Sequence, residues 1–169
     1  MPRAAVPLAV LLLATALDAS ANSDVRVLGG HAYGLEDTPP HAWLAGGAVT
    51  TALGPRVRVG LEVLHAHMFG FEYFERRATL FNPIVEYHFA PDSRFSPYVT
   101  GGLGFTLYRS LYPSGPDPQR LEWEYGSSFN LGGGGGVRIF LTKRLFVSPE
   151  VRLGWIPFIR STIAVGYRF

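Results

Sequence analysis

The chain ends in Ile163-Ala164-Val165-Gly166-Tyr167-Arg168-Phe169, a stretch in which every odd-numbered position is apolar and the last residue is aromatic. The alternation extends back to Leu145: 10 of the 13 odd-numbered positions are apolar, against 4 of the 12 even-numbered ones. The even-numbered set instead contains Glu150, Arg152, Arg160 and Arg168. Successive side chains of a β-strand point to opposite faces, so the pattern predicts strands with one apolar and one polar face.

The same alternation recurs from Val25 onward and is interrupted by residues that favour turns. It predicts eight strands: Asp24–Leu35, His41–Leu53, Arg56–Phe69, Arg77–Ala90, Pro97–Ser110, Trp123–Leu141, Leu145–Ile156 and Ile159–Phe169. Most of them have 11 to 15 residues, whereas strands of soluble sheets typically have about five or six. Because tilted strands of about 9 to 11 residues cross a bilayer, these segments are long enough to cross one and protrude.

The connections between these strands alternate in length. Compact turns at 54–55, 91–96 and 142–144 follow the second, fourth and sixth strands, and longer segments at 36–40, 70–76 and 111–122 follow the first, third and fifth. Outer-membrane barrels have an even strand count, short periplasmic turns and longer outer loops. The connections therefore predict a barrel with both termini in the periplasm. The last connection, around Pro157, is unusually short for an outer loop.

The charged residues decide between a soluble barrel and a membrane barrel. A soluble barrel turns its apolar face inward, and a membrane barrel turns it outward to lipid. The polar faces of the predicted strands carry Arg58, Glu62, Asn82, Glu86, Asn130, Arg138, Glu150, Arg152 and Arg160. Around a buried ligand, unpaired ions would cost roughly several kcal/mol each, whereas in an eight-stranded lumen they can pair across the barrel.

The pattern therefore predicts an all-β, eight-stranded antiparallel transmembrane barrel whose lumen holds a structural polar network. We predict that this network consists of Arg58, Glu62, Glu86, Arg138, Glu150, Arg152 and Arg160. Glycines share the same face and are expected to leave room in a narrow lumen: Gly60, Gly102, Gly104, Gly132, Gly134 and Gly136.

Two groups of aromatic residues lie near the predicted strand ends. Trp43, Phe69, Trp123, Tyr125 and Trp155 lie toward the outer loops, and Tyr87, Phe89, Tyr167 and Phe169 lie toward the periplasmic turns. Amphipathic rings concentrate at both interfaces of a membrane, so these groups predict two girdles.

The first 21 residues have the features of an export signal. Arg3 supplies a positive start, residues 4–17 are apolar, and Ala19-Ser20-Ala21 is a small-x-small cleavage site. This apolar stretch of 14 residues is shorter than the roughly 20 that a transmembrane helix needs. We therefore predict a cleaved signal peptide over 1–21 and a barrel over 22–169.

The composition excludes several other classes of protein. Only 17% of the residues are charged and 47% are hydrophobic, which is too apolar for a disordered chain. The absence of cysteine excludes a disulfide framework, a thiolate metal site and a lipid-anchored N-terminal cysteine. A net charge of +2 is too weak to indicate nucleic-acid binding.

Four local features occur in order along the predicted barrel. They are the glycine-rich strand 97–105, the strand 131–141 followed by Thr142-Lys143-Arg144, the segment 148–152, and the terminal Val165-Gly166-Tyr167-Arg168-Phe169. Together they resemble the small outer-membrane β-barrels of the OmpA/OmpX type over essentially the whole mature chain. The resemblance implies an up-and-down barrel in the outer membrane without a cofactor. It also implies that Val165, Tyr167 and Phe169 form the signal read by the barrel-assembly machinery.

Small barrels of this kind include lipid A deacylases and palmitoyltransferases, so an enzyme that acts on lipid A is a candidate class. A deacylase of that type has a His-x-Ser pair, and none of the five histidines here has a serine two positions later. His65 and His67 share a strand face, but without a third ligand they indicate headgroup-level side chains and no metal site. We therefore predict a protein that is not an enzyme, with a lipid A-modifying enzyme as the alternative.

The interior of an eight-stranded barrel is just wide enough for side chains, so the charged lumen predicts an ion-pair network, with a narrow channel as the alternative. The segment 112–122, stiffened by Pro113, Pro116 and Pro118, offers Tyr112 and Arg120 for surface contacts. We expect a monomer with a structural or surface-interaction role in the cell envelope. Its expected partners are outer-membrane lipids, lipopolysaccharide and, during insertion, the assembly machinery.

Overall fold

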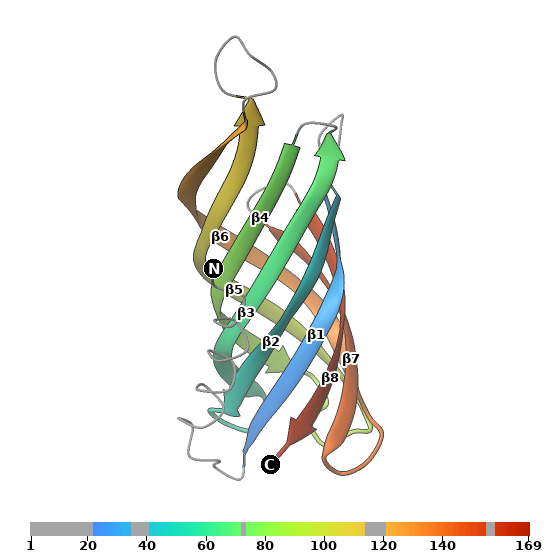
Figure 1. Ribbon diagram of the computed structural model, residues 1–169. Helices are drawn as coiled ribbons and strands as arrows, with labels where there is room; N and C mark the ends of the chain where they lie inside the picture. Colours follow the sequence, from blue (N-terminus) through green and yellow to red (C-terminus); the bar gives the residue numbers. More distant parts are fainter. Residues whose placement is uncertain (1–21, 35–40, 72–73, 114–120, 155–157) are drawn as a thin grey trace.

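The computed structural model describes residues 22–34, 41–71, 74–113, 121–154 and 158–169. They form eight strands: β1 (Ser23–Gly34), β2 (His41–Ala52), β3 (Val57–Phe71), β4 (Phe74–His88), β5 (Phe95–Pro113), β6 (Leu121–Phe140), β7 (Leu145–Gly154) and β8 (Phe158–Arg168). Each strand pairs antiparallel with its sequence neighbours, and β1 pairs with β8, so the sheet closes (Figure 1). The predicted eight-stranded up-and-down barrel is confirmed. Among the described residues, no helix is long and apolar enough to cross a membrane.

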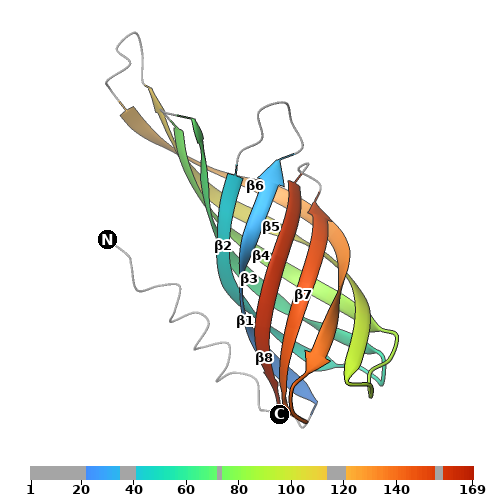
Figure 2. The same cartoon turned by 90° about the vertical axis from the view of Figure 1, so that its right-hand side faces the viewer.

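The two ends of the barrel differ. The turn end carries the C-terminus and the compact connections 53–56, 89–94 and 141–144, and the loop end carries the other four connections (Figure 1). At the loop end β5 and β6, with 19 and 20 residues, extend well beyond β7 and β8, with 10 and 11 (Figure 2). The predicted signal peptide and the centre of the predicted 111–122 loop lie outside the described residues.

Two of the predicted connections were too long. The segment 70–76 was expected to be a loop, but β3 runs to Phe71 and β4 begins at Phe74. The segment 111–122 was also expected to be a loop, but β5 runs to Pro113 and β6 begins at Leu121. The backbone ladder continues through polar pairs such as Ser110 with Glu124, since a hairpin that has left the bilayer no longer needs apolar side chains.

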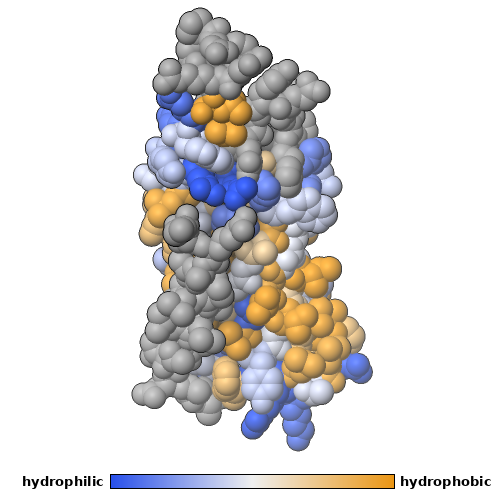
Figure 3. All heavy atoms as spheres, viewed as in Figure 1, coloured by the Kyte–Doolittle hydropathy of each residue, from blue (hydrophilic) through white to orange (hydrophobic). Residues whose placement is uncertain are grey.

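One rule covers the described side chains of all eight strands: even-numbered residues face the lumen and odd-numbered residues face outward. Val85, Val99, Leu103 and Val151 are exposed, whereas the intervening charged side chains such as Glu86 are buried. The barrel is thus apolar outside and polar inside, the reverse of a soluble protein. In Figure 3 the apolar residues gather below a hydrophilic belt near the loop end.

At several lumen-facing positions glycine is required because an adjacent strand lies too close for a side chain, and not because the lumen is narrow. A Cβ atom at Gly60 would lie 2.0 Å from the carbonyl oxygen of Val49, and one at Gly134 would lie 2.0 Å from that of Val151. At these positions the adjacent strand occupies the space that a side chain would need. The expectation that the glycines merely leave room in the lumen is therefore corrected for these two positions.

Other glycines are covered by an aromatic ring from the directly opposed residue. A Cβ atom at Gly166 would meet the ring of Phe146, and one at Gly136 would meet the hydroxyl end of Tyr98. Such cross-strand pairs shield a glycine backbone and help to fix strand register. The rings of Tyr98 and Phe146 lie inside the lumen, where the guanidinium group of Arg138 packs over both.

Candidate functional site

The turn-side half of the lumen is filled by a cluster of ions. Arg138 of β6 binds Asp24 of β1 and Glu86 of β4, each at 2.5 Å. Arg58 lies 2.8 Å from Asp24, and Arg26 lies 2.6 Å from Glu86. All five side chains are buried. Because two carboxylates here meet three guanidinium groups, each carboxylate has two cationic partners.

Neutral side chains complete this turn-side cluster. Thr50 donates to Asp24 at 2.8 Å and accepts from Arg58 Nε at 3.1 Å. His88 Nε2 lies 3.3 Å from Glu86, and its Nδ1 lies 3.0 Å from Ser96 Oγ. Thr50 and His88 thus give Asp24 and Glu86 one further polar partner each, which helps to offset the desolvation of the buried ions.

A second cluster lies nearer the loop end. Arg160 donates to both oxygens of Glu62 at 3.0 and 3.2 Å, in a bidentate arrangement. Arg152 lies between Glu62, at 3.2 Å, and Glu150, at 2.7 Å. Tyr98 donates from its hydroxyl to Glu150 at 2.9 Å and stacks on His88 of the turn-side cluster. The two clusters therefore form a connected plug across the barrel.

The structure brings all seven predicted lumen residues into these two clusters. Sequence reasoning missed Asp24, Arg26, His88 and Tyr98, although each occupies an even-numbered position. Asp24 and Arg26 flank Val25, where the apolar alternation of β1 begins, so the apolar pattern by itself does not mark them. Applying the parity rule to every strand would have found them.

The loop-side half of the lumen corrects the prediction of a wholly polar interior. There the inward side chains of β1 to β4 are apolar and form a cluster, called here the loop-side chamber, that consists of the buried Ala32, Ala42, Leu44, Ala66 and Ala78 and the partly buried Leu80. Met68, Tyr108 and Phe158 pack against it. Near the loop end these strands have apolar or small residues at even positions as well as odd ones, so the charged inward positions of the turn side do not continue there.

Near the loop end of β1 and β2, the inward side chains are therefore apolar or small, so polarity no longer alternates as it does on the turn side, although the strands continue.

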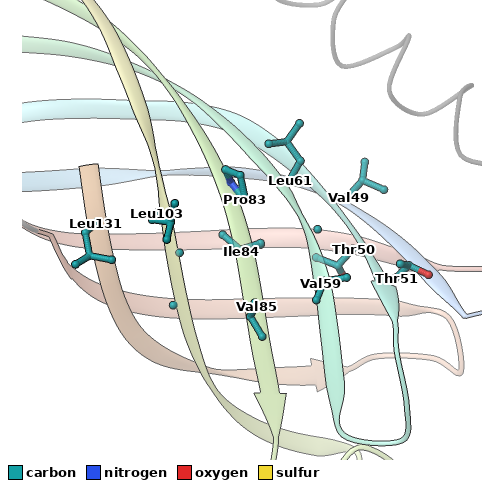
Figure 4. A pocket seen from close by; sticks show the side chains of 13 residues that line it. Val49, Thr50, Thr51, Val59, Leu61, Pro83, Ile84, Val85, Leu103 and Leu131 are labelled. Atoms are coloured by element: carbon teal, nitrogen blue, oxygen red, sulfur yellow. The ribbon is translucent and has the colours of Figure 1, made fainter. Parts of the chain in front are cut away.

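The outer surface carries the predicted girdles and a concave apolar area. Trp43, Trp123 and Tyr125 near the loop end are 64%, 39% and 73% exposed, and Tyr87, Phe89, Tyr167 and Phe169 form the other group at the turn end. The two other predicted members Phe69 and Trp155 lie outside the described side chains. Between the girdles, a groove of about 850 Å³ is lined by outward side chains that include Leu61, Pro83, Val85 and Leu103 (Figure 4).

The residues predicted to form the assembly signal end the outward face of β8. Val165 and Tyr167 are partly exposed on the outside of the barrel, and the ring of Phe169 meets that of Tyr167 at a centroid distance of 5.3 Å. The backbone N–H of Phe169 donates to Ser23 at 2.9 Å, which holds the C-terminus against β1. The signal role of these residues stays a prediction.

The two histidines considered as metal ligands also face outward. His65 Nδ1 lies 3.2 Å from Thr79 Oγ1 of the neighbouring strand β4, and His67 is opposite Arg77 in the register. In the described part of the chain, no three His, Asp or Glu side chains gather closely enough to hold a metal ion.

A closed antiparallel barrel with an apolar exterior, aromatic residues near both ends and an ion-paired interior defines a transmembrane β-barrel of the outer-membrane type. Comparison with solved structures agrees with this class. The chain is similar to Neisserial surface protein A, with a TM-score of 0.69 and 15% identity over 89% of this chain and 98% of that one. It is also similar to the outer membrane protein OprG from Pseudomonas aeruginosa, with a TM-score of 0.63 and 12% identity over 88% and 96%.

A third similar structure is that of the outer membrane enzyme PagL, with a TM-score of 0.52 and 14% identity over 86% of this chain and 99% of that one. No protein-family model matches the sequence, and no curated protein matches it. At these identities the similarity establishes the fold: a small eight-stranded barrel of the outer-membrane type, as the OmpA/OmpX resemblance implied.

Proposed function

We propose that this protein is a monomeric integral protein of the outer membrane with a closed lumen, and that its role in the envelope is structural or surface-interacting and not enzymatic. The ion-paired plug is the observation that carries the proposal. Arg138 is fully buried and spans the lumen between Asp24 and Glu86. An open pore would need this contact and the loop-side ion pairs to separate.

The energetics favour a plug that stays closed. Removing one partner of a buried ion pair typically costs about 3–5 kcal/mol, because the other charge stays buried without compensation. Opening the lumen would break several such contacts together, including the two that Glu62 makes with Arg160. Eight strands also enclose little space beyond that of their own side chains.

Recordings of the purified barrel in planar lipid bilayers would test the closed lumen. We expect the current to stay at the level of protein-free bilayers. Stable single-channel conductances would overturn the closed lumen and favour a narrow channel.

Membrane fractionation would test the location. We expect the protein in the outer-membrane fraction, with different mobilities on gels before and after boiling, because folded barrels resist detergent until they are heated. Recovery without detergent in the periplasmic fraction would contradict the proposal.

The proposed partners follow from the two faces of the barrel. The outward apolar residues, such as Leu103 and Val151, fit the acyl chains of outer-membrane lipids and lipopolysaccharide. The assembly machinery is proposed to engage the outward end of β8. The proposal includes no cofactor and no nucleic acid.

A lipid A-modifying enzyme is the second candidate, and one contact favours it. His65 and Thr79 lie 3.2 Å apart on the lipid-facing side, which is the relation of a base to a hydroxyl nucleophile. Mass spectrometry of lipid A from cells that overproduce the protein would decide. Altered acylation that disappears in His65→Ala would establish the enzyme, and unchanged lipid A would support the non-enzymatic role.

A further inference from the structure

A cavity of about 140 Å³ lies in the loop-side half of the lumen, in the loop-side chamber. Its walls include Ala32, Ala42, Ala66 and Ala78, which are opposed in two pairs in the register. Because these four side chains stop at Cβ, the wall formed by β1 to β4 is set back from the barrel axis. Leu44, Leu80 and Phe158 add further apolar surface, and on the side of β5 and β6 the lining includes Thr106 and Asn130, which are hydrogen-bonded to each other at 2.9 Å.

The volume and the lining define the size of a ligand. An apolar cavity of about 150 Å³ in another protein stays dry and binds benzene. The chamber therefore matches one aromatic ring or a short alkyl group. A larger lipid would have to displace the surrounding side chains.

The polar side of the cavity, called here the floor of the chamber, is formed by Asn82, Arg152 and Arg160, and it excludes a charged ligand. Arg152 and Arg160 line the cavity, but both are paired with Glu62, and both also contact Glu150. Two cations and two anions balance, so the floor offers no net charge to a ligand. A buried ion added here would lack a partner.

The same floor has one unused acceptor and one unused donor. Asn82 and Arg160 both donate to Oε1 of Glu62, at 3.2 and 3.0 Å, so their side chains lie side by side. Within the described residues, Asn82 Oδ1 and Arg160 Nε are buried and have no hydrogen-bond partner. A hydroxyl group can donate to the first and accept from the second.

Among the described residues, the pairing of β6 with β7 stops next to the chamber. The β6–β7 ladder ends at the pair Gly132 and Gly154, while β6 continues to Leu121 with β5 as its partner (Figure 2). The cavity lining reaches Leu131 and Leu153, whose side chains are exposed on the lipid-facing side.

We propose that the loop-side chamber is a binding site for a small neutral molecule that consists of one aromatic ring or a short alkyl chain and bears one hydroxyl group. The apolar walls hold the ring or chain, and Asn82 and Arg160 bind the hydroxyl. This site goes beyond the proposed envelope role and does not depend on it, since its apolar walls lie on the loop side of the ion plug and only its floor is shared with the plug, through Arg152 and Arg160.

Phenol is a suitable probe, followed by NMR of the full barrel in detergent micelles with labelled Leu and Ala methyl groups. We expect saturable shifts at the inward Leu44, Leu80 and Ala66. We expect no matching shifts at the outward Leu103 and Leu107, which report partitioning of phenol into detergent. Equal and non-saturable shifts on both faces would overturn the proposal.

A variant whose cavity is filled by a larger side chain is compared with a variant that carries the same side chain on the outer face. Ala66→Phe puts a ring into the cavity and should weaken phenol binding by about tenfold or more, which corresponds to about 1.4 kcal/mol. Ala45→Phe adds the same ring on the outward face of β2 and should leave the affinity unchanged. If Ala66→Phe fails to fold, Ala78→Val fills part of the same space and should weaken binding in the same direction. Unchanged binding in the folded filling variant would overturn the site.

Toluene has nearly the size of phenol and tests the hydroxyl separately. We expect weaker saturable binding of toluene at the same methyl groups. Binding as tight as that of phenol would overturn the role of Asn82 and Arg160, and the absence of saturable binding by both probes would overturn the whole site.

Discussion

Arg138 in β6 and Asp24 in β1 are 114 positions apart in the sequence, and their side chains lie 2.5 Å apart in the lumen. The two strands are not neighbours in the sheet, so the contact crosses the barrel. Arg138 also binds Glu86 of β4. One guanidinium group therefore joins three strands that share no hydrogen-bond ladder with one another.

This relationship predicts a large loss of stability in Arg138→Met, which keeps much of the side-chain volume and removes the charge. Asp24 and Glu86 would each lose a buried partner, and the free energy of unfolding should fall by about 3–5 kcal/mol. Urea unfolding of the barrel in lipid vesicles measures it. Arg144→Met, at an exposed turn, is the control and should change stability by no more than about 0.5 kcal/mol. A loss below about 1 kcal/mol in Arg138→Met would contradict the plug.

Adjacent glycines of β6 should respond differently to the same substitution. A Cβ atom in Gly134→Ala would lie 2.0 Å from the carbonyl oxygen of Val151, whereas one in Gly133→Ala would have 3.5 Å to its nearest atom. We expect Gly134→Ala to destabilise the barrel by about 1–3 kcal/mol, the usual cost of overpacking, and Gly133→Ala to have little effect. Equal urea midpoints for the two variants would show that the close approach is not a constraint.

The depth of the apolar band can be measured with arginine substitutions. Leu103→Arg places a charge midway along the outward face of β5 and should cost about 2–4 kcal/mol in a bilayer, while Tyr125→Arg near the loop end should cost about 0–1 kcal/mol. Unfolding in lipid vesicles provides both values. Similar costs at the two positions would place the membrane elsewhere on the barrel.

Phe169→Ala should impair assembly more than stability. The substitution removes the ring but keeps the backbone hydrogen bond to Ser23, so folding in vesicles should change little. In cells, the fraction inserted into the outer membrane should drop if the assembly machinery reads the ring. Phe89→Ala removes an aromatic side chain from the same girdle and is the matched control. Normal insertion of Phe169→Ala would contradict the predicted signal.

The alternation of apolar and polar residues was sufficient to predict the architecture, because a membrane barrel needs it on every strand. The strands reach farther at the loop end than predicted, since pairs such as Arg76 with Ser110 form a ladder in water without an apolar face. The parity of Glu62, Arg138 and the other charged residues predicted which side chains would face inward. Their partners depend on strand tilt and register, which the pattern does not contain.

The loop-side chamber was missed for a related reason. Ala32 and Ala66 are apolar at even positions, where the pattern on other strands led us to expect polar residues, and a small apolar side chain carries no signal of a cavity. The closed barrel brings these alanines together from strands that are distant in sequence. In the sequence these alanines look like any other small strand residue, and only the folded barrel shows that they line a cavity.

The constant inward direction of even-numbered residues gives each strand a reading frame with a period of two. Inserting or deleting a single residue inside a strand would exchange the two faces from that point to the next connection, so that arginines would meet lipid and leucines would meet ions. A change of two residues would preserve the frame and only lengthen or shorten the wall. In the course of evolution, the strands of this barrel should therefore change length in steps of two, while the connections at the loop end can vary by any number.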